Sequence, residues 1–127
     1  MPDKTLPTSG QLERNLSQQI QKLYRDKVGS KPEKVACHLL KEKITIIIDE
    51  ALTQPEQLLV DQGKNHLTEQ VRSDLDKAVE EDLRELIEEI VGVKVVDLLM
   101  DTELESGRSG IIVILAQQPD LRRSNRS

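Results

Sequence analysis

Apolar residues recur every three or four positions between residues 12 and 24. This spacing places them on one face of a helix. Thr8, followed three residues later by Gln11, forms the sequence pattern of a capping box, and Gly29 is a typical stop. The pattern therefore predicts an amphipathic helix over residues 10–28.

Beyond Pro32 the period changes. Apolar residues alternate with their neighbours over residues 35–39 and 44–48, as in strands with one buried face. We expect a β-hairpin that turns near Lys41 to Lys43. The continuous run of Ile46, Ile47 and Ile48 indicates burial on both faces of the second strand. Helices would cover one face, and either a second copy of the chain or a mobile segment would cover the other. The second copy is the simpler explanation, so we expect a homodimer.

A second helical region begins at Thr53, where Glu56 three residues later again gives a capping box. Apolar residues then lie four apart until Gly92 ends the pattern. One unbroken helix over residues 55–91 would be roughly 55 Å long, too long for a domain of this size. We therefore expect a break near residues 78–81, at an acidic cluster suited to a helix N-terminus. Gly63 is the second candidate.

The C-terminal part predicts two further strands, over residues 93–100 and 111–115, joined by a polar connection over residues 101–110. The element order is then α-β-β-α-α-β-β. This order favours an α+β fold of two layers, with a four-stranded, mainly antiparallel sheet and helices on one face. We expect a single domain over residues 10–116, a flexible tail over 1–9 and a flexible basic tail over 117–127.

Composition and charge narrow the possible functions. Tyr24 is the only aromatic residue, so the core must be aliphatic. Nucleic-acid bases would also lack the aromatic side chains on which they usually stack. Residues 44–106 carry 5 basic and 17 acidic side chains, a net charge of −12. Such an acidic region repels phosphate backbones and favours basic partners. The order of elements resembles one type of KH domain, but the RNA-binding G-x-x-G loop is absent, so we expect no nucleic-acid partner.

The single cysteine and the hydropathy of the chain indicate the cellular compartment in which we expect the protein. The only cysteine is Cys37, and the first residues lack an apolar segment typical of a signal peptide. No apolar stretch approaches the roughly 20 residues of a membrane span. We expect a cytoplasmic protein without direct membrane insertion, reaching the inner membrane only through a protein partner.

The sequence offers no catalytic or metal-binding pattern. Cys37 and His38 are adjacent in a predicted strand, so their side chains point to opposite faces and cannot form a dyad. Two histidines and one cysteine without clustered spacing do not suit a zinc site. We expect no cofactor and no enzymatic activity.

Two segments are candidates for binding. Glu81, Glu85, Glu88 and Glu89 are spaced to form an acidic helix face, which either docks a basic partner or is simply solvated. The second segment combines glycines, hydroxyls and one arginine that suit an anion such as bicarbonate or a nucleotide. It consists of Ser106, Gly107, Arg108, Ser109 and Gly110. The alternative is an ordinary glycine-containing connection between strands.

Six segments together resemble the MpsC-like family of small bacterial proteins. They cover residues 10–14, 52–59, 71–75, 86–93, 96–99 and 105–112, and read GQLER, LTQPEQLL, VRSDL, LIEEIVGV, VDLL and ESGRSGII. The family is named for a cation-translocating system that generates membrane potential and is tied to the uptake of inorganic carbon. The resemblance implies no catalytic residues.

These observations leave three hypotheses. The first is a non-catalytic accessory or regulatory protein that docks on a larger assembly, with the subunit of a membrane cation or bicarbonate transporter as partner. The second is a sensor that binds a small anion or nucleotide at Gly107 and Arg108. The third is an enzyme that uses Cys37 or His38.

Overall fold

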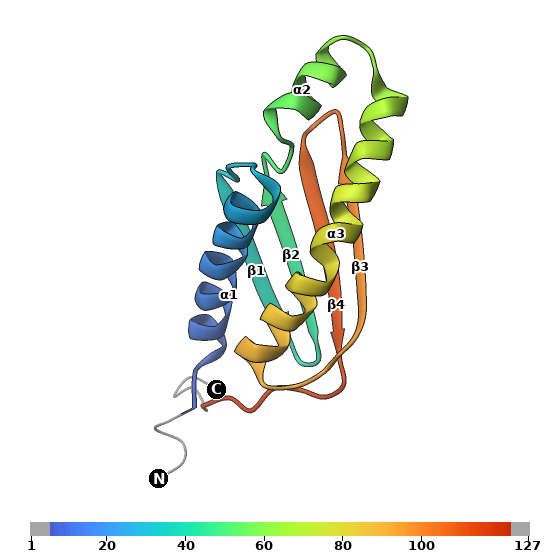
Figure 1. The fold of residues 1–127 in the computed structure, drawn as a ribbon. Coiled ribbons are helices and arrows are strands. Elements are labelled where there is room, and N and C mark those ends of the chain that lie inside the picture. Colours follow the sequence, from blue (N-terminus) through green and yellow to red (C-terminus); the bar gives the residue numbers. More distant parts are fainter. Residues whose placement is uncertain (1–5, 123–127) are drawn as a thin grey trace.

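The computed structural model describes residues 6–122 (Figure 1). The elements in chain order are α1 (Ser9–Leu23), the π-helical turn η2 (Tyr24–Val28), β1 (Lys34–Leu40), β2 (Lys43–Asp49), α2 (Gln54–Asp61), α3 (Asn65–Val91), β3 (Val95–Glu103) and β4 (Arg108–Leu115). The predicted order α-β-β-α-α-β-β is confirmed. The capping box at Thr8 and the turn after β1 also form where the sequence places them.

The four strands form one antiparallel sheet in the order β1-β2-β4-β3. Helices α1 and α3 lie against one face of this sheet, and α2 with the first turns of α3 extends beyond its end (Figure 1). The α+β class with helices on one face is therefore confirmed. The opposite face, which we call the open face, carries no helix within residues 6–122.

Strand alternation builds an aliphatic core between the two layers. Ile44, Ile46 and Ile48 of β2 point toward the helices and are fully buried, whereas Ile47 between them lies on the open face. On the helix side the core is completed by residues of α1, η2 and α3, including Leu16, Ile20, Tyr24, Val79, Leu83 and Ile87. The predicted aliphatic core is thus present, with Tyr24 as its one aromatic side chain.

The predicted helix break near residues 78–81 is wrong. The break lies at Gln62 to Lys64, where Gly63 has φ +75° and the N–H of Lys64 donates to the carbonyl of Leu59. α3 then runs without interruption for 27 residues. The acidic cluster at 80–82 does not end it, because charged side chains on the outer side of a helix keep their hydration.

The polar connection over residues 101–110 is also shorter than expected. β3 continues to Glu103 and β4 begins at Arg108, with these two residues paired in the ladder. Polar side chains are tolerated here because β3 is an edge strand with one face in water. Only residues 104–107 form the turn.

Residues 1–5 and 123–127 of the predicted tails lie outside the described residues. Within the described part, Pro119 is buried and Leu121 packs against the core. The N–H of Arg122 donates to the carbonyl of Pro7 at 2.8 Å. Segments on both sides of the predicted 10–116 domain therefore contact each other at one end of the molecule.

Candidate functional site

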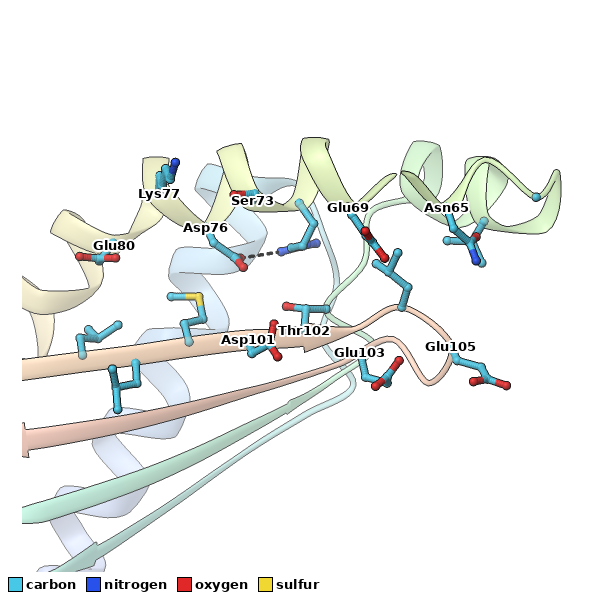
Figure 2. A pocket seen from close by; sticks show the side chains of 17 residues that line it. Asn65, Glu69, Ser73, Asp76, Lys77, Glu80, Asp101, Thr102, Glu103 and Glu105 are labelled. Carbon is cyan, nitrogen blue, oxygen red and sulfur yellow. Dashed lines mark hydrogen bonds and ion pairs between the residues drawn. The ribbon is translucent and has the colours of Figure 1, made fainter. Parts of the chain in front are cut away.

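A groove lies between α3 and the edge strand β3 (Figure 2). It encloses about 1160 Å³ and runs from the α2–α3 turn at Gly63 to Leu98 in the middle of β3. Carboxylates are frequent in its lining: Glu69, Asp76 and Glu80 from α3, and Asp101, Glu103 and Glu105 from β3 and the following turn. Strand alternation places the side chains of Asp101 and Glu103 on the opposite face of the sheet, so they belong to the outer edge of the groove. The cationic lining residues are Arg72 and Lys77.

Helical spacing places the α3 side chains along the groove. Glu69, Ser73, Asp76 and Glu80 recur three or four residues apart and therefore share one face of the helix. In Figure 2 the side chain of Glu69 and that of Asp76 point from α3 toward β3. The groove thus combines an acidic helix face with the outer edge of the sheet.

A buried arginine joins the groove to the inside of the fold. The guanidinium of Arg72 donates to both carboxylate oxygens of Glu56, from Nε at 2.9 Å and from Nη2 at 2.6 Å. Nη2 also donates to the carbonyl of Ala51 at 2.9 Å, and Nη1 reaches Oδ1 of Asp76 at 3.3 Å. The side chains of Arg72 and Glu56 are only 5% and 1% exposed. This bidentate geometry is the strongest form of a carboxylate–guanidinium pair.

The same cluster ties three segments together. Glu56 completes the capping box of α2, because its Oε1 accepts from the N–H and the hydroxyl of Thr53. Through Arg72 this carboxylate also links α3 to the end of β2 at Ala51. The cluster therefore fixes where the α2–α3 hairpin projects from the sheet, and with it one end of the groove.

Asp76 is the second carboxylate that the guanidinium of Arg72 contacts. Burial raises the pKa of Asp76, the guanidinium of Arg72 acts in the opposite direction, and the charges of Glu56 and Asp101 add to the rise. Two carboxylates thus share one buried guanidinium. A further cation entering the groove would be stabilised by the carboxylate that Arg72 leaves partly uncompensated.

The predicted anion segment is spread over different surroundings. Arg108 is exposed on the open face, where its Nε donates to Oδ1 of Asp49 at 2.8 Å. Ser109 is buried and its hydroxyl is hydrogen-bonded to that of Thr102.

The remaining residues of this segment form the turn and the ladder. The N–H of Gly107 donates to the carbonyl of Glu103, and the hydroxyl of Ser106 accepts from the N–H of Arg108. Gly110 sits within the ladder, opposite Ile47 and Asp101. Anion binding here stays a prediction.

The predicted acidic helix face lies on α3, outside the groove. Glu81, Glu85 and Glu89 are exposed. Glu88 is half-buried, and its Oε2 accepts from the N–H of Val95 at 2.8 Å. Glu88 therefore caps the beginning of β3, while the other three remain available on the surface.

Cys37 and His38 point to opposite faces of the sheet, as the strand alternation predicts. Cys37 is buried beneath α1, and burial raises the pKa of its thiol, whereas His38 is exposed on the open face. Within residues 6–122, no three His, Cys, Asp or Glu side chains are grouped as metal ligands would be.

The sequence did not reveal the role of Arg72. Glu56 was recognised only as a capping residue, and apolar spacing was followed through positions 67, 71 and 75. In the first turns of α3 the buried residues are instead Thr68 and Arg72, whereas from Val79 onward the predicted apolar positions do face inward, at Leu83, Ile87 and Val91. A run of residues four apart drifts by about 40° per step around a helix of 3.6 residues per turn, so such a run does not stay on the buried face.

The fold and the groove define a small two-layer α+β protein with an acidic groove beside the edge strand of its sheet. The model of the family described as "Na+-translocating membrane potential-generating system (MpsC)" matches residues 8–117. The chain belongs to this family, which confirms the resemblance seen in its sequence. No curated protein and no solved structure matches the chain. None of the helices in the described part of the chain is long and apolar enough to cross a membrane.

Proposed function

We propose that this protein is a non-catalytic accessory subunit that binds a basic, extended segment of a membrane-bound partner in the groove between α3 and β3. The observation that carries the proposal is the acidic lining of this groove, where Glu69, Asp76 and Glu80 lie along α3 and Glu105 lies in the turn after β3, against two cationic residues. One of those two, Arg72, is already held by Glu56 and Asp76. A basic segment would therefore meet a surface of complementary charge.

The edge position of β3 favours an extended segment. β3 is the edge strand of the sheet beside the groove, so its outer backbone groups have no strand partner within the described residues. At its beginning these groups are occupied, because Glu88 accepts from the N–H of Val95 and Arg84 donates to the carbonyl of Val95. Leu98 and Met100 lie further along, within the groove lining. An added strand would pair there and place alternate side chains toward α3.

The family supports a partner in a membrane-potential-generating system. We propose that this partner is a subunit of a cation or inorganic-carbon transporter, and that one of its cytoplasmic loops or tails is rich in lysine and arginine. Such segments are common on the cytoplasmic side of membrane proteins. The accessory protein would then reach the membrane through its partner, without inserting.

The groove is a better candidate than the exposed acidic face of Glu81, Glu85 and Glu89. A convex helix face offers only solvated charges, and exposed ion pairs contribute little. The groove adds apolar contacts and backbone hydrogen bonds. The anion-sensor hypothesis has less support, since Nε of Arg108 is already paired with Asp49.

The test compares two variants of equal charge. Glu69→Gln with Glu80→Gln removes two carboxylates from the groove, and Glu81→Gln with Glu85→Gln removes two from the exposed face. The probe is a fluorescent peptide of alternating lysine and leucine, followed by fluorescence anisotropy at low and moderate salt. At about 0.5 kcal/mol for each lost pairing, we expect the groove variant to bind about fivefold more weakly.

The control variant should keep its affinity within about twofold, since its charges lie outside the groove and screening reduces their effect. Equal weakening of both variants would mean that the peptide responds only to net charge, and the groove proposal would be wrong. Circular dichroism of both variants checks that the fold is retained.

A further inference from the structure

The open face of the sheet carries an apolar centre. Leu99, Ile112 and Ile47 are 61%, 45% and 41% exposed, and they belong to three neighbouring strands. The ladder places Leu99 opposite Ile112, and Ile47 opposite Gly110. Ile114 is half-buried on the same face. Apolar side chains gathered in this way on a flat sheet are typical of a surface that another protein covers.

Charged residues border this centre in a regular order. At the end of the sheet nearest the β3–β4 turn, one transverse row reads Lys34, Asp49, Arg108 and Glu103. The signs therefore alternate from β1 to β3. β3 also exposes Asp97 and Asp101, so the β3 side of the open face is acidic, while β1 contributes Lys34 and His38.

We propose that two copies of this protein pack their open faces together around a two-fold axis that runs parallel to the strands. This operation brings β1 of one copy over β3 of the other and β2 over β4, at the usual sheet separation of about 10 Å. Lys34 then faces Glu103 of the second copy, and Asp49 faces its Arg108. Every charge in the row meets one of opposite sign.

The other two-fold arrangement of the faces is less favourable. An axis perpendicular to the strands would place each strand against its own copy in reverse, so that Glu103 would face Asp97 and Asp49 would face Lys43 of the second copy. Like charges directly opposed are destabilising, and the unlike pair only offsets them. The parallel axis gives unlike pairs alone along the charged row, so the charge pattern favours the second copy as occupant and this direction of the axis.

The size of the face suits a modest, specific dimer. Four strands spaced about 4.8 Å apart and about seven residues long give a flat area of roughly 450 Å² on each copy. The accessible area is larger than the flat area, so the pair reaches the lower end of specific interfaces, about 1,200 Å² in total. Asp97 and Asp101 fall at the rim, where water still reaches them.

The axis direction has a consequence for the groove. Because the axis runs along the strands, both α2–α3 hairpins project from the same end of the dimer. The two grooves therefore open at that end, and a partner with two basic segments would engage both at once. Linked binding of this kind raises the apparent affinity without any new contact.

The first test measures the mass of the full chain by light scattering at micromolar concentration. We expect a dimer, and a monomer would overturn the proposal. Ile112→Lys should give a folded monomer, since it buries a charge in the apolar centre. Leu58→Lys is the matched control, because Leu58 is 60% exposed on α2, away from the open face. This control should remain a dimer. A dimer in Ile112→Lys would place the interface elsewhere.

The second test identifies the axis. Lys34 and Glu103 of one chain are separated by two strands, about 14 Å, which is beyond direct pairing. Lys34→Glu alone and Glu103→Lys alone should each weaken dimerisation about tenfold, because the symmetry repeats each contact. The variant carrying both changes should return to within about twofold of the wild type. If the losses of dimer affinity in the two single variants simply added up in the double variant, this axis would be ruled out.

Discussion

Arg72 is the residue on which the junction of α2, α3 and β2 depends. Its guanidinium satisfies a carboxylate, Glu56, that is 1% exposed and also caps α2. A buried ion pair is not by itself stabilising, since both charges have lost their hydration. Removing one member, however, leaves the other buried and uncompensated, and this asymmetry can be measured.

We expect Arg72→Met to lower the free energy of unfolding by about 3–5 kcal/mol, because the carboxylate of Glu56 would be left buried without its partner. Adding Glu56→Gln should recover part of this loss, since the amide oxygen can still accept from Thr53 while the charge is gone. Urea unfolding followed by circular dichroism measures both variants.

Arg25→Met serves as the control for Arg72→Met. Arg25 is exposed and its nearest carboxylate, on Asp26, is 3.9 Å away. Its replacement should change the free energy of unfolding by less than about 0.5 kcal/mol. A double variant no more stable than Arg72→Met alone would contradict the explanation based on an uncompensated charge.

Among the elements, the boundaries that rest on local chemistry were predicted well. Thr8 begins α1 through its capping box, and Gly29 ends the first helical segment with φ +87°. The hairpin turns at Lys41, which has φ +56°. Each of these signals depends only on neighbours within a few residues, so the sequence alone contains them.

The boundaries that depend on tertiary packing were predicted poorly. Acidic residues at 80–82 match the composition of a helix start, but α3 continues through them because Val79 and Leu83 pack inward on either side. β3 extends through Asp101 to Glu103 because β4 supplies ladder partners. Neither local sequence shows which neighbour will lie beside it.

Alanine substitutions at two glycines test where the helices begin and end, because we expect one to destabilise the fold and the other to stabilise it. Gly63 has φ +75° with open space around an added Cβ, so Gly63→Ala should destabilise the fold by about 1 kcal/mol through backbone strain alone. Gly10 lies within α1, and an added Cβ would meet only Oγ1 of Thr8, at 4.0 Å. Gly10→Ala should stabilise by about 0.5 kcal/mol.

Thermal and urea unfolding of these two alanine variants provide the comparison. The sign of each change in the free energy of unfolding decides the test, and its magnitude does not. A stabilising Gly63→Ala would mean that α2 and α3 can join into one continuous helix, and the hairpin that closes the end of the groove would then not be a fixed feature.

At the scale of the whole molecule, the groove could be predicted only in part. The sequence shows the acidic excess of residues 44–106, and spacing of three or four residues drew attention to Glu81, Glu85, Glu88 and Glu89. The face that lines the groove is instead that of Glu69, Asp76 and Glu80. Which face of α3 meets β3 is set by the docking of residues far apart in sequence.

Tyr24 joins the N-terminal helical segment to β3, so the ionisation of its phenol indicates whether these parts of the fold unfold together. It lies in η2, fully buried, and its hydroxyl contacts Sδ of Met100 in β3 at 3.8 Å. Burial raises the pKa of Tyr24 well above its ordinary value of 10.0, the negative charge of Asp76 adds to the rise, and Arg72 acts in the opposite direction. Because Tyr24 is the only aromatic residue, its titration can be followed without interference from other phenols.

The raised pKa fixes the sign of one contribution to stability. Above pH 10.0 the unfolded chain releases the phenolic proton while the folded chain retains it, so this contribution to stability falls as the pH rises. We expect tyrosinate absorbance to appear only as the protein unfolds, in the same transition as the loss of far-ultraviolet circular dichroism. In urea the phenol should titrate near its ordinary value. Tyrosinate formation near pH 10 with the helical signal intact would show that η2 opens separately from the sheet, so that the contact between Tyr24 and Met100 does not join the N-terminal layer to β3.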